Sequence, residues 1–484
     1  MTTTDAGASA GIRRSHAYGD ELAGFDGVAT AQAVRSGALS ASEVVRAAIA
    51  RARAVEPAVH AMVVDDFDRA QAAGDAGRTG AFAGVPTVIK DMTDVAGLPT
   101  RNGSAAFSRA GPAEETGALA AQLFDMGMVG LGKSTMPEFG FIPCAEFPDL
   151  EATRNPWNLN RSTGGSSGGS AALVAAGVVP IAHGADGGGS IRIPAACCGL
   201  VGLKATRGRL AKPPESRLMP VDVEVEGVLS RTVRDTALFF AEAERRHRSR
   251  RLPPVGHVTR PLVRRLRVGT VLESPNGALV DAPTRAAFER AVTLLESLGH
   301  EVRPVDFPAG RQFADDFIQY WSTLAYAVSV QGHRLFDPTF DRSQLTQLTR
   351  GLAERCRRNL ARAPGAVYRL RRSAADYAKA IAGVDVVLSP VVNTIAPEIG
   401  HLAMDLPFDE VFPRAEAWVG YTPLANATGA PAISLPLHHD EASGLPVGMM
   451  FSAAHGQDAL LLGLALALEE AAPWPTLGGS LAPR

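Results

Sequence analysis

The sequence predicts an α/β protein with a large mixed, mostly parallel β-sheet that helices cover on both faces. Runs of β-branched residues alternate with amphipathic helical patterns along the whole chain, which is typical of this class. Residues 266–305 contain a complete strand–helix–strand unit. A central stretch, Asn155–Gly208, combines two glycine-serine clusters with small apolar residues. Glycine between residues that must be buried indicates a close backbone approach or a positive φ, so this stretch belongs to the core.

Each element is predicted from its own local pattern. Ser40 and Glu43 form a capping box that begins a helix with one apolar face. The strand Pro86–Lys90 is β-branched and ends in a lysine. The other predicted helices are 30–36, 67–76, 116–126, 284–298, most of 312–380 and 459–470. The other predicted strands are 62–64, 129–131, 266–270, 300–305, 384–389, 431–436 and 447–452, and residues 227–240 are predicted to form a strand followed by a helix.

The composition excludes several classes of function. The 484 residues are 46% hydrophobic and 20% charged with a net charge of −2, which favours a globular protein that binds neither nucleic acid nor an anionic membrane. Four cysteines lack metal-ligand spacing, so we expect no metal site, no cofactor and a reducing compartment. No run approaches the roughly 18 apolar residues of a membrane span, and the first residues lack a signal-peptide pattern. We therefore expect a cytoplasmic protein.

The chain is expected to fold as one domain. Residues 1–25 are polar and irregular and are predicted to be a flexible arm. The domain covers 26–473, with a core at 80–240 and 380–473 and a substrate-side insertion at about 245–380. Residues 474–484 are a tail.

A nucleotide-binding pattern occurs at Gly127–Ser134, where G-x-x-x-x-G-K-[ST] is satisfied. A P-loop needs a strand before its first glycine and a helix at its lysine. Here a helix precedes Gly127, the loop carries strand residues, and Pro137 follows closely. The pattern therefore indicates a helix C-cap followed by a strand.

The second glycine-serine cluster has the chemistry of an acyl-transfer site. Successive glycine N–H groups at Gly187, Gly188 and Gly189 can converge on one developing oxyanion. Ser190 follows directly, where a carbonyl would meet these donors, and is our candidate nucleophile.

Residue patterns alone leave the base open. His183 lies seven residues before Ser190, but no G-x-S-x-G elbow surrounds the serine, and a lone histidine in an apolar run is more often a core residue. A lysine can act as a base when burial depresses its pKa. Lys90 and Lys133 both lie near strand ends.

Several separate motifs resemble the amidase signature family, over about residues 28–473. They are G-G-S-S-G-G-S at Gly164–Ser170, the D-x-G-G-S-I-R-I-P pattern from Asp186, C-G-x-x-G-L-K ending at Lys204, Ile89-Lys90-Asp91, GKSTMPEFGF at Gly132–Phe141 and NPWN at Asn155–Asn158. Within the family, the sequence is most similar to actinobacterial amidases and 6-aminohexanoate cyclic dimer hydrolases.

The resemblance implies the amidase signature fold and a catalytic set of Ser190, Ser166 and Lys90, with a cis peptide before Ser166. Neutral Lys90 would take a proton from Ser166, which takes one from Ser190 during attack. Gly187, Gly188 and Gly189 would then form the oxyanion hole, together with the N–H of Ser190.

The resemblance also implies roles around the site. Asp186 and Arg192 would pair to hold the turn, and Ser167 would donate a supporting hydrogen bond. Phe139 and Phe141, with the backbone of Glu138, would contact substrate. Two residues, Ala205 and Gly187, depart from the family pattern. Neither is a reacting group, so these departures are expected to affect the shape of the pocket and not the chemistry.

The implied function is an amidase that hydrolyses C–N bonds of small carboxamides, including aryl or cyclic and oligomeric amides, through an acyl-enzyme. The alternatives are a carbamate-cleaving urethanase and a protein like the glutamyl-tRNA amidotransferase component that belongs to this family. Segments around 312–345 and 400–425 are expected to set the substrate. A monomer or homodimer is expected.

Overall fold

Eight strands form the main sheet of the computed structural model, which describes residues 12–20, 22–212, 219–306 and 309–478. They are β6 (Ile181–Asp186), β7 (Val201–Lys204), β8 (Val225–Ser230), β9 (Arg267–Thr270), β10 (Glu301–Pro304), β11 (Val386–Pro390), β12 (Ala432–Asp440) and β13 (Leu445–Ala453). Their order across the sheet is β10–β9–β11–β13–β12–β7–β8–β6. This large mixed sheet confirms the predicted α/β class.

The prediction of a mostly parallel sheet was wrong. Of the neighbouring pairs of described strands, β10–β9 and β9–β11 run parallel, whereas β11–β13, β13–β12, β12–β7, β7–β8 and β8–β6 run antiparallel. The β12 and β13 strands are joined by the short turn 441–444, which can only connect antiparallel neighbours. The alternation of strands and helices along the sequence also does not determine which strands become neighbours in the sheet. For example, β8 lies between β6 and β7.

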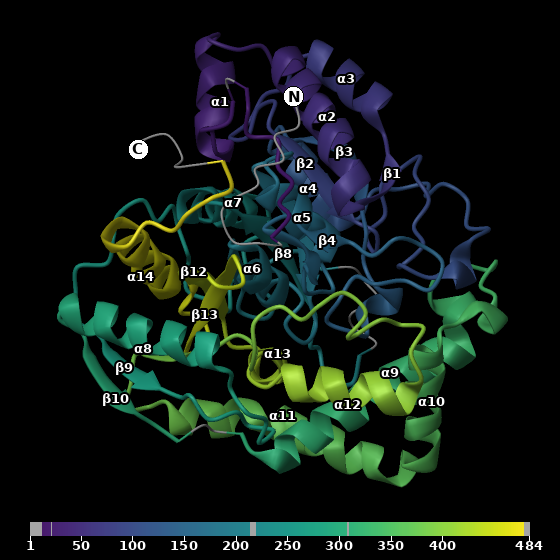
Figure 1. Ribbon diagram of the computed structural model, residues 1–484, viewed down its shortest axis with the longest axis vertical. Helices are drawn as coiled ribbons and strands as arrows, with labels where there is room; N and C mark the ends of the chain where they lie inside the picture. Colours follow the sequence, from purple (N-terminus) through teal and green to yellow (C-terminus); the bar gives the residue numbers. More distant parts are fainter. Residues whose placement is uncertain (1–11, 21, 213–218, 307–308, 479–484) are drawn as a thin grey trace.

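Helices cover both faces of the sheet (Figure 1). Their bounds are α1 (Gly27–Ser36), α2 (Ala41–Val59), α3 (Phe67–Asp75), α4 (Ala118–Asp125), α5 (Gly168–Ala175), α6 (Arg192–Cys198), α7 (Val233–Arg246), α8 (Ala282–Ser297), α9 (Arg311–Leu335), α10 (Gln347–Arg358), α11 (Ala363–Ala380), α12 (Phe408–Trp418), α13 (Pro423–Thr428) and α14 (Asp458–Ala471). Along β11, Val386 and Leu388 point into the core beneath α7, α8 and α14, while Val387 points into the core that includes α5 and α6. This alternation places two hydrophobic layers around one sheet.

A second, three-stranded sheet carries the lysine-ended strand. It contains β1 (Met62–Asp65), β3 (Val129–Ser134) and β2 (Pro86–Lys90), in the order β1–β3–β2. A two-stranded ribbon is formed by β4 (Arg154–Asn155) and β5 (Asn158–Ser162). The capping box of Ser40 and Glu43 begins α2 as predicted.

The P-loop pattern folds as the sequence analysis expected. Gly127 has a φ of +96° just after α4, and Gly132 and Lys133 lie inside β3. No helix begins at Lys133, so the pattern does not form a phosphate-binding loop.

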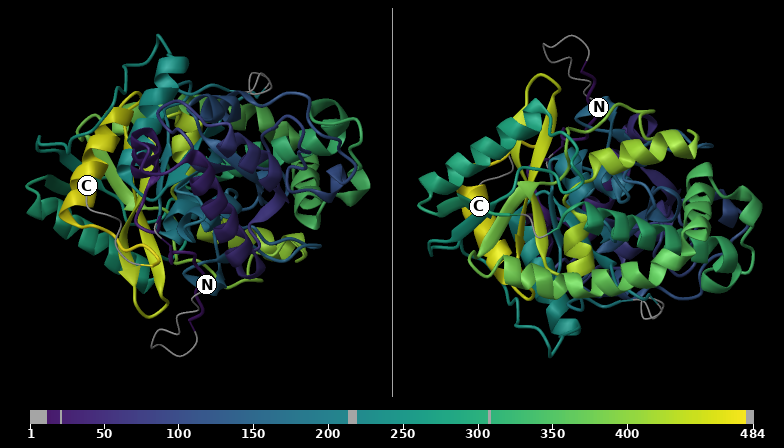
Figure 2. Two further views of the ribbon diagram at one scale, coloured as in Figure 1. Left: turned by 90° about the horizontal axis from the view of Figure 1, so that it is seen from above. Right: turned by 90° about the horizontal axis from the view of Figure 1, so that it is seen from below.

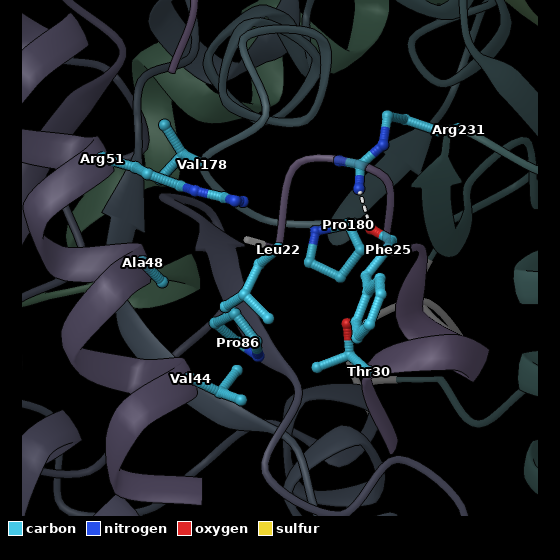
Figure 3. A pocket seen from close by; sticks show the side chains of 10 residues that line it. All are labelled: Leu22, Phe25, Thr30, Val44, Ala48, Arg51, Pro86, Val178, Pro180 and Arg231. Atoms are coloured by element: carbon cyan, nitrogen blue, oxygen red, sulfur yellow. Dashed lines mark hydrogen bonds between the residues drawn. The ribbon is translucent and has the colours of Figure 1, made fainter. Parts of the chain in front are cut away.

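The N-terminal segment departs from the prediction of a flexible arm, at least over its described residues 12–20 and 22–25. Ser15 N–H donates to Pro156 O at 3.0 Å, and Ala17 N–H donates to Ala176 O at 2.9 Å. A small pocket lies beneath this segment, where the guanidinium of Arg231 donates to Phe25 O at 2.6 Å (Figure 3). Backbone hydrogen bonds of this kind cannot be read from a polar sequence. The first eleven residues of the expected arm lie outside the described residues.

Residues 245–380, expected as one insertion, divide between two places. β9, α8 and β10 extend the main sheet, whereas α9, α10 and α11 form a helical group (Figure 1). In both views of Figure 2, α9 and α10 lie at the end of the molecule opposite α14. Among the described helices, none has the length and apolar character needed to cross a bilayer.

Candidate active site

The glycine turn after β6 is organised by one buried carboxylate. Asp186 accepts hydrogen bonds from the N–H groups of Gly189 at 2.8 Å and Ile191 at 3.1 Å. Its oxygens also bind the guanidinium of Arg192 at 2.8 and 2.9 Å, which confirms the expected pair. Burial alone would raise the pKa of Asp186, but Arg192 and the Asn426 amide outweigh it and hold this pKa well below its usual range. The carboxylate therefore stays charged and fixes the turn.

The turn leaves a different donor set from the predicted one. Because Gly189 N–H donates to Asp186, it is not free to bind an oxyanion. The N–H groups of Gly187, Gly188 and Ser190 have no hydrogen-bond partner among the described residues. Gly189 has a φ of +136°, and a Cβ there would lie 2.4 Å from Thr422 Oγ1, so only glycine fits. The structure thus leaves Gly187, Gly188 and Ser190 as available donors.

Ser166 lies beside this turn, at the entrance to α5. A cis peptide bond precedes it, as the resemblance implied. The next residue ties the two glycine-serine clusters together, since Ser167 N–H donates to Ser190 O at 3.2 Å. Ser167 Oγ also donates to Ala185 O at 3.2 Å, in the supporting role expected for it.

Lys90 reaches Ser166 from the end of β2. Its amine donates to Ser166 Oγ at 2.7 Å and to Ala185 O at 3.4 Å, and the residue is only 1% exposed. Burial lowers the pKa of Lys90 from its ordinary value to about 8, although nearby carboxylates oppose this shift. A substantial fraction of the amine is therefore neutral just above neutral pH.

The two other candidate bases have structural partners. Lys133 pairs with the Asp91 carboxylate at 2.7 Å, and its amine also donates to Thr100 Oγ1 at 2.6 Å. His183 contacts the backbone of Lys90 and the Glu226 carboxylate, and none of its hydrogen bonds reaches Ser190. The geometry therefore favours Lys90 over both alternatives.

Ser190 faces a cavity of about 900 Å³, a volume that includes its open mouth. Gly140 lines the same cavity, and a Cβ added to Gly140 would lie 2.8 Å from Ser166 Oγ. Ser166 therefore lies directly behind the cavity wall. The Ser190 hydroxyl has no hydrogen-bond partner within the described part of the chain. Its surroundings leave it available to a bound molecule.

An aromatic stripe on α9 forms the wall opposite the glycine turn. Phe317 stacks on Trp321 with ring centroids 5.7 Å apart, and Phe313 extends the row. A Cβ at Gly187 would contact the Trp321 ring at 3.4 Å. The rest of the lining comes mainly from residues 140–143, from α12 and from the loop around Pro275, and it is apolar except for Asn276 and Glu416. The regions expected to set the substrate therefore contribute to the wall, through helices α9 and α12 and through Val419 and Gly420 in the loop after α12.

The three predicted substrate contacts lie in different places. Phe141 lines the cavity and accepts a hydrogen bond from Trp321 Nε1 at 3.1 Å through its carbonyl. Phe139 packs behind Phe141 and is not a lining residue. The Glu138 carboxylate accepts from Ser104 Oγ at 2.7 Å and also binds residues at the start of α10, while its carbonyl accepts from Phe141 N–H. Glu138 therefore holds loops together and does not contact the cavity.

Sequence reasoning missed two parts of this site. The aromatic residues at 313, 317 and 321 recur every fourth position, a spacing that places them on one helical face and could have marked the wall. The contacts of His183 and Glu226 near Lys90 join β6, β8 and β2, and no local pattern signals them. Within the described ranges, no three His, Cys, Asp or Glu side chains gather closely enough to hold a metal ion.

Comparison with known proteins agrees with this geometry. The family model described as Amidase matches residues 43–462. AmiC of Mycobacterium tuberculosis, described by its name as an amidase, is 49% identical over 469 residues, which cover 96% of this chain and 98% of AmiC. A solved 6-aminohexanoate cyclic dimer hydrolase with bound substrate superposes with a TM-score of 0.85 at 31% identity, over 94% of this chain and 98% of that one. A bacterial aryl acylamidase of the amidase signature family superposes with a TM-score of 0.81 at 26% identity, over 93% and 97%.

Replacing Asp186 by Asn tests the buried pair that holds the turn. Asp186→Asn keeps the shape of the side chain but leaves the Arg192 guanidinium buried without its counter-charge. We therefore expect the free energy of unfolding to fall by about 3–5 kcal/mol. Urea titration followed by circular dichroism measures it. The partly exposed Glu354, which pairs with Arg357 and Arg358, provides the control, because Glu354→Gln should change the midpoint little. Equal effects of the two substitutions would contradict the proposed importance of burial.

Proposed function

Because the chain belongs to the amidase family and hydrolyses amide carbon–nitrogen bonds, we propose that Ser190, Ser166 and Lys90 carry out this reaction. The observation that supports this assignment most is the buried amine of Lys90, which donates to Ser166 Oγ at 2.7 Å. A lysine in that setting is a base only when it is neutral, and burial favours the neutral form.

The reaction proceeds by proton transfer along this row of groups. Ser190 Oγ attacks the amide carbonyl and gives its proton to Ser166, which passes its own proton to neutral Lys90. The tetrahedral intermediate collapses when the proton returns through Ser166 to the leaving amine and the C–N bond breaks. Water then attacks the acyl-enzyme by the same route and releases the acid, which restores the free Ser190 hydroxyl.

The oxyanion of the intermediate is stabilised by main-chain donors. The N–H groups of Gly187, Gly188 and Ser190 are the available ones, and a single donor of this kind typically contributes about 3–4 kcal/mol. Gly189, the third glycine of the predicted set, instead supports the turn through Asp186. The carbonyl of Gly188 accepts from Thr422 Oγ1 at 2.6 Å, which orients the peptide that follows.

The preferred substrates are small amides with an aromatic or extended apolar group next to the scissile bond. The stacked rings of Phe313, Phe317 and Trp321 border the glycine turn and suit a flat or long apolar group. Similarity to a cyclic dimer hydrolase and to an aryl acylamidase supports the same class.

We further propose a cytoplasmic location and a monomeric or homodimeric state. The described cysteines, Cys144, Cys197, Cys198 and Cys356, are free thiols and buried, which suits a reducing compartment. Cell fractionation and light scattering of the purified protein test these two statements.

Ser190→Ala tests the nucleophile. The substitution removes the attacking oxygen, so turnover of p-nitroanilides should fall to background, at least about 10⁴-fold, while the fold is kept. Ser434 is a fully buried serine of β12 whose hydroxyl has no hydrogen bond among the described residues, so Ser434→Ala is the control and should keep full turnover. Residual turnover in Ser190→Ala above one tenth of the native rate would eliminate the assignment.

The pH dependence tests the base. Since Lys90 acts when deprotonated and its pKa is about 8, kcat/KM should rise with pH along an acid limb centred near pH 8. Lowering the pH protonates the Lys90 amine, and the protonated amine cannot accept a proton from Ser166, so the rate falls. Initial rates between pH 6 and 10 on a neutral anilide measure the limb, with enzyme stability checked at each pH. A rate that stays flat from pH 6 to 9 contradicts a lysine base.

Phe317→Ala tests the aromatic wall. Loss of this ring should raise KM for a benzoyl or hexanoyl anilide about tenfold or more, because burying an aromatic ring is worth roughly 1.5–3 kcal/mol. Acetanilides should change less. Phe336, which packs on Phe107 and Phe139 away from the cavity, provides the control substitution Phe336→Ala. A panel that includes a carbamate and a cyclic diamide reports which relatives of the preferred amide are also cleaved.

A further inference from the structure

Two buried side chains contact Lys90 and have no part in the proton path described above. His183, in the middle of β6, accepts the backbone N–H of Lys90 on Nδ1 at 3.3 Å and is fully buried. Its other ring nitrogen, Nε2, lies 3.3 Å from Glu226 Oε1. Glu226 belongs to β8, which pairs antiparallel with β6. A chain of contacts therefore runs from β8 through β6 to the end of β2.

The contacts define the protonation state of the imidazole. Nδ1 receives a hydrogen from Lys90 N–H, so it carries no proton of its own. The ring proton is then on Nε2, where it faces the Glu226 carboxylate. An imidazolium would place two N–H donors against each other at Lys90. The backbone of Lys90 thus requires a neutral His183 in one tautomer.

Glu226 remains charged in this buried place. Burial alone would raise the pKa of Glu226, but the contact with His183, the hydrogen bond from Thr93 and the charge of Lys90 outweigh it and lower this pKa. Thr93 Oγ1 donates to Glu226 Oε1 at 2.7 Å. Glu226 therefore provides a fixed negative charge near the amine.

Two other acidic groups face Lys90, Glu224 and Asp186, and both favour its charged form more strongly than Glu226 does. Asp186 on β6 is already paired with the Arg192 guanidinium. Burial and the neighbouring Glu226 raise the pKa of Glu224, just before β8, to about 7, so its charge is partly lost near neutral pH. Of the three carboxylates, Glu226 is the one whose contacts lead through His183 to the backbone of Lys90.

We propose that His183 and Glu226 form a positioning pair for Lys90. The imidazole holds the backbone of Lys90 so that the amine points at Ser166, and the carboxylate holds the imidazole in the accepting tautomer. The charge of Glu226 also opposes loss of the proton from the amine. The inference rests on the proposed role of Lys90 as the base. Neither residue touches the substrate, since neither lines the cavity.

Glu226→Gln tests the charge of the pair. The amide oxygen can keep the contact with His183 and the hydrogen bond from Thr93, so mainly the charge is removed, and the acid limb of kcat/KM should move to lower pH by about one pH unit. Glu242 on α7 is a comparably buried carboxylate that pairs with Arg245 and Arg246, and Glu242→Gln is the control that should leave the limb unchanged. A Glu226→Gln limb within 0.2 pH units (roughly the error of such a fit) of the native one overturns the proposal.

His183→Leu tests the positioning contact and decides the matter if Glu226→Gln does not fold. Leucine fills a similar volume but cannot accept from Lys90 N–H, so kcat should fall about tenfold to a hundredfold with KM within about twofold. A kcat within twofold of the native value overturns the proposal. The experiments distinguish a failure of this inference from a failure of the proposed function. An inactive Ser190→Ala with an unmoved Glu226→Gln limb removes only the positioning pair, whereas an active Ser190→Ala removes the catalytic assignment as well.

Discussion

The site depends on keeping one amine out of water without giving it a carboxylate to bind directly. Lys90 is almost completely buried, and its closest polar contact is the neutral hydroxyl of Ser166 at 2.7 Å. Burial disfavours the charged amine, and the carboxylates nearby limit that effect without contacting it, so the pKa settles at about 8. A closer carboxylate would keep the amine charged and unable to accept a proton. A more apolar setting would leave it a weaker base. The surrounding fold sustains the balance between these two limits.

That balance requires segments far apart in the chain to meet within a few ångströms. Lys90 comes from the small sheet, Ser166 from the loop before α5, and Ser190 from the turn between β6 and α6. The backbone bond from Ser167 to Ser190 joins the two serine clusters, and Asp186 with Arg192 fixes the turn against α13. The aromatic row of α9 then closes the opposite side. Rigid core elements hold the reacting groups, while peripheral helices shape the cavity, so the bound group can vary without disturbing the proton path.

Much of this arrangement could be predicted from the sequence, because its signals are local. The capping box of Ser40 and the strand that ends at Lys90 were expected from local patterns, whereas the resemblance pointed to Ser166 and to the Asp186–Arg192 pair. Strand direction was misjudged, since the order of neighbours depends on connections whose path no local pattern records. The donor set was misjudged at Gly189 for a related reason. A run of glycines shows that N–H groups can converge, but not that a carboxylate three residues earlier has already engaged one of them.

Two lysines at equivalent strand ends show why residue type alone does not identify a base. Lys90 ends β2, and Lys133 lies at the end of the adjacent parallel strand β3, and both are fully enclosed. Lys133 contacts the Asp91 carboxylate at 2.7 Å, so removing its proton would leave a buried negative charge without its partner. Lys90 contacts a hydroxyl, so its neutral form leaves no uncompensated charge in direct contact. A lysine therefore holds two loops together at position 133, whereas the lysine at position 90 is free to exchange a proton. The difference is set by which oxygen lies within 3 Å of the amine, a choice that only the folded chain makes.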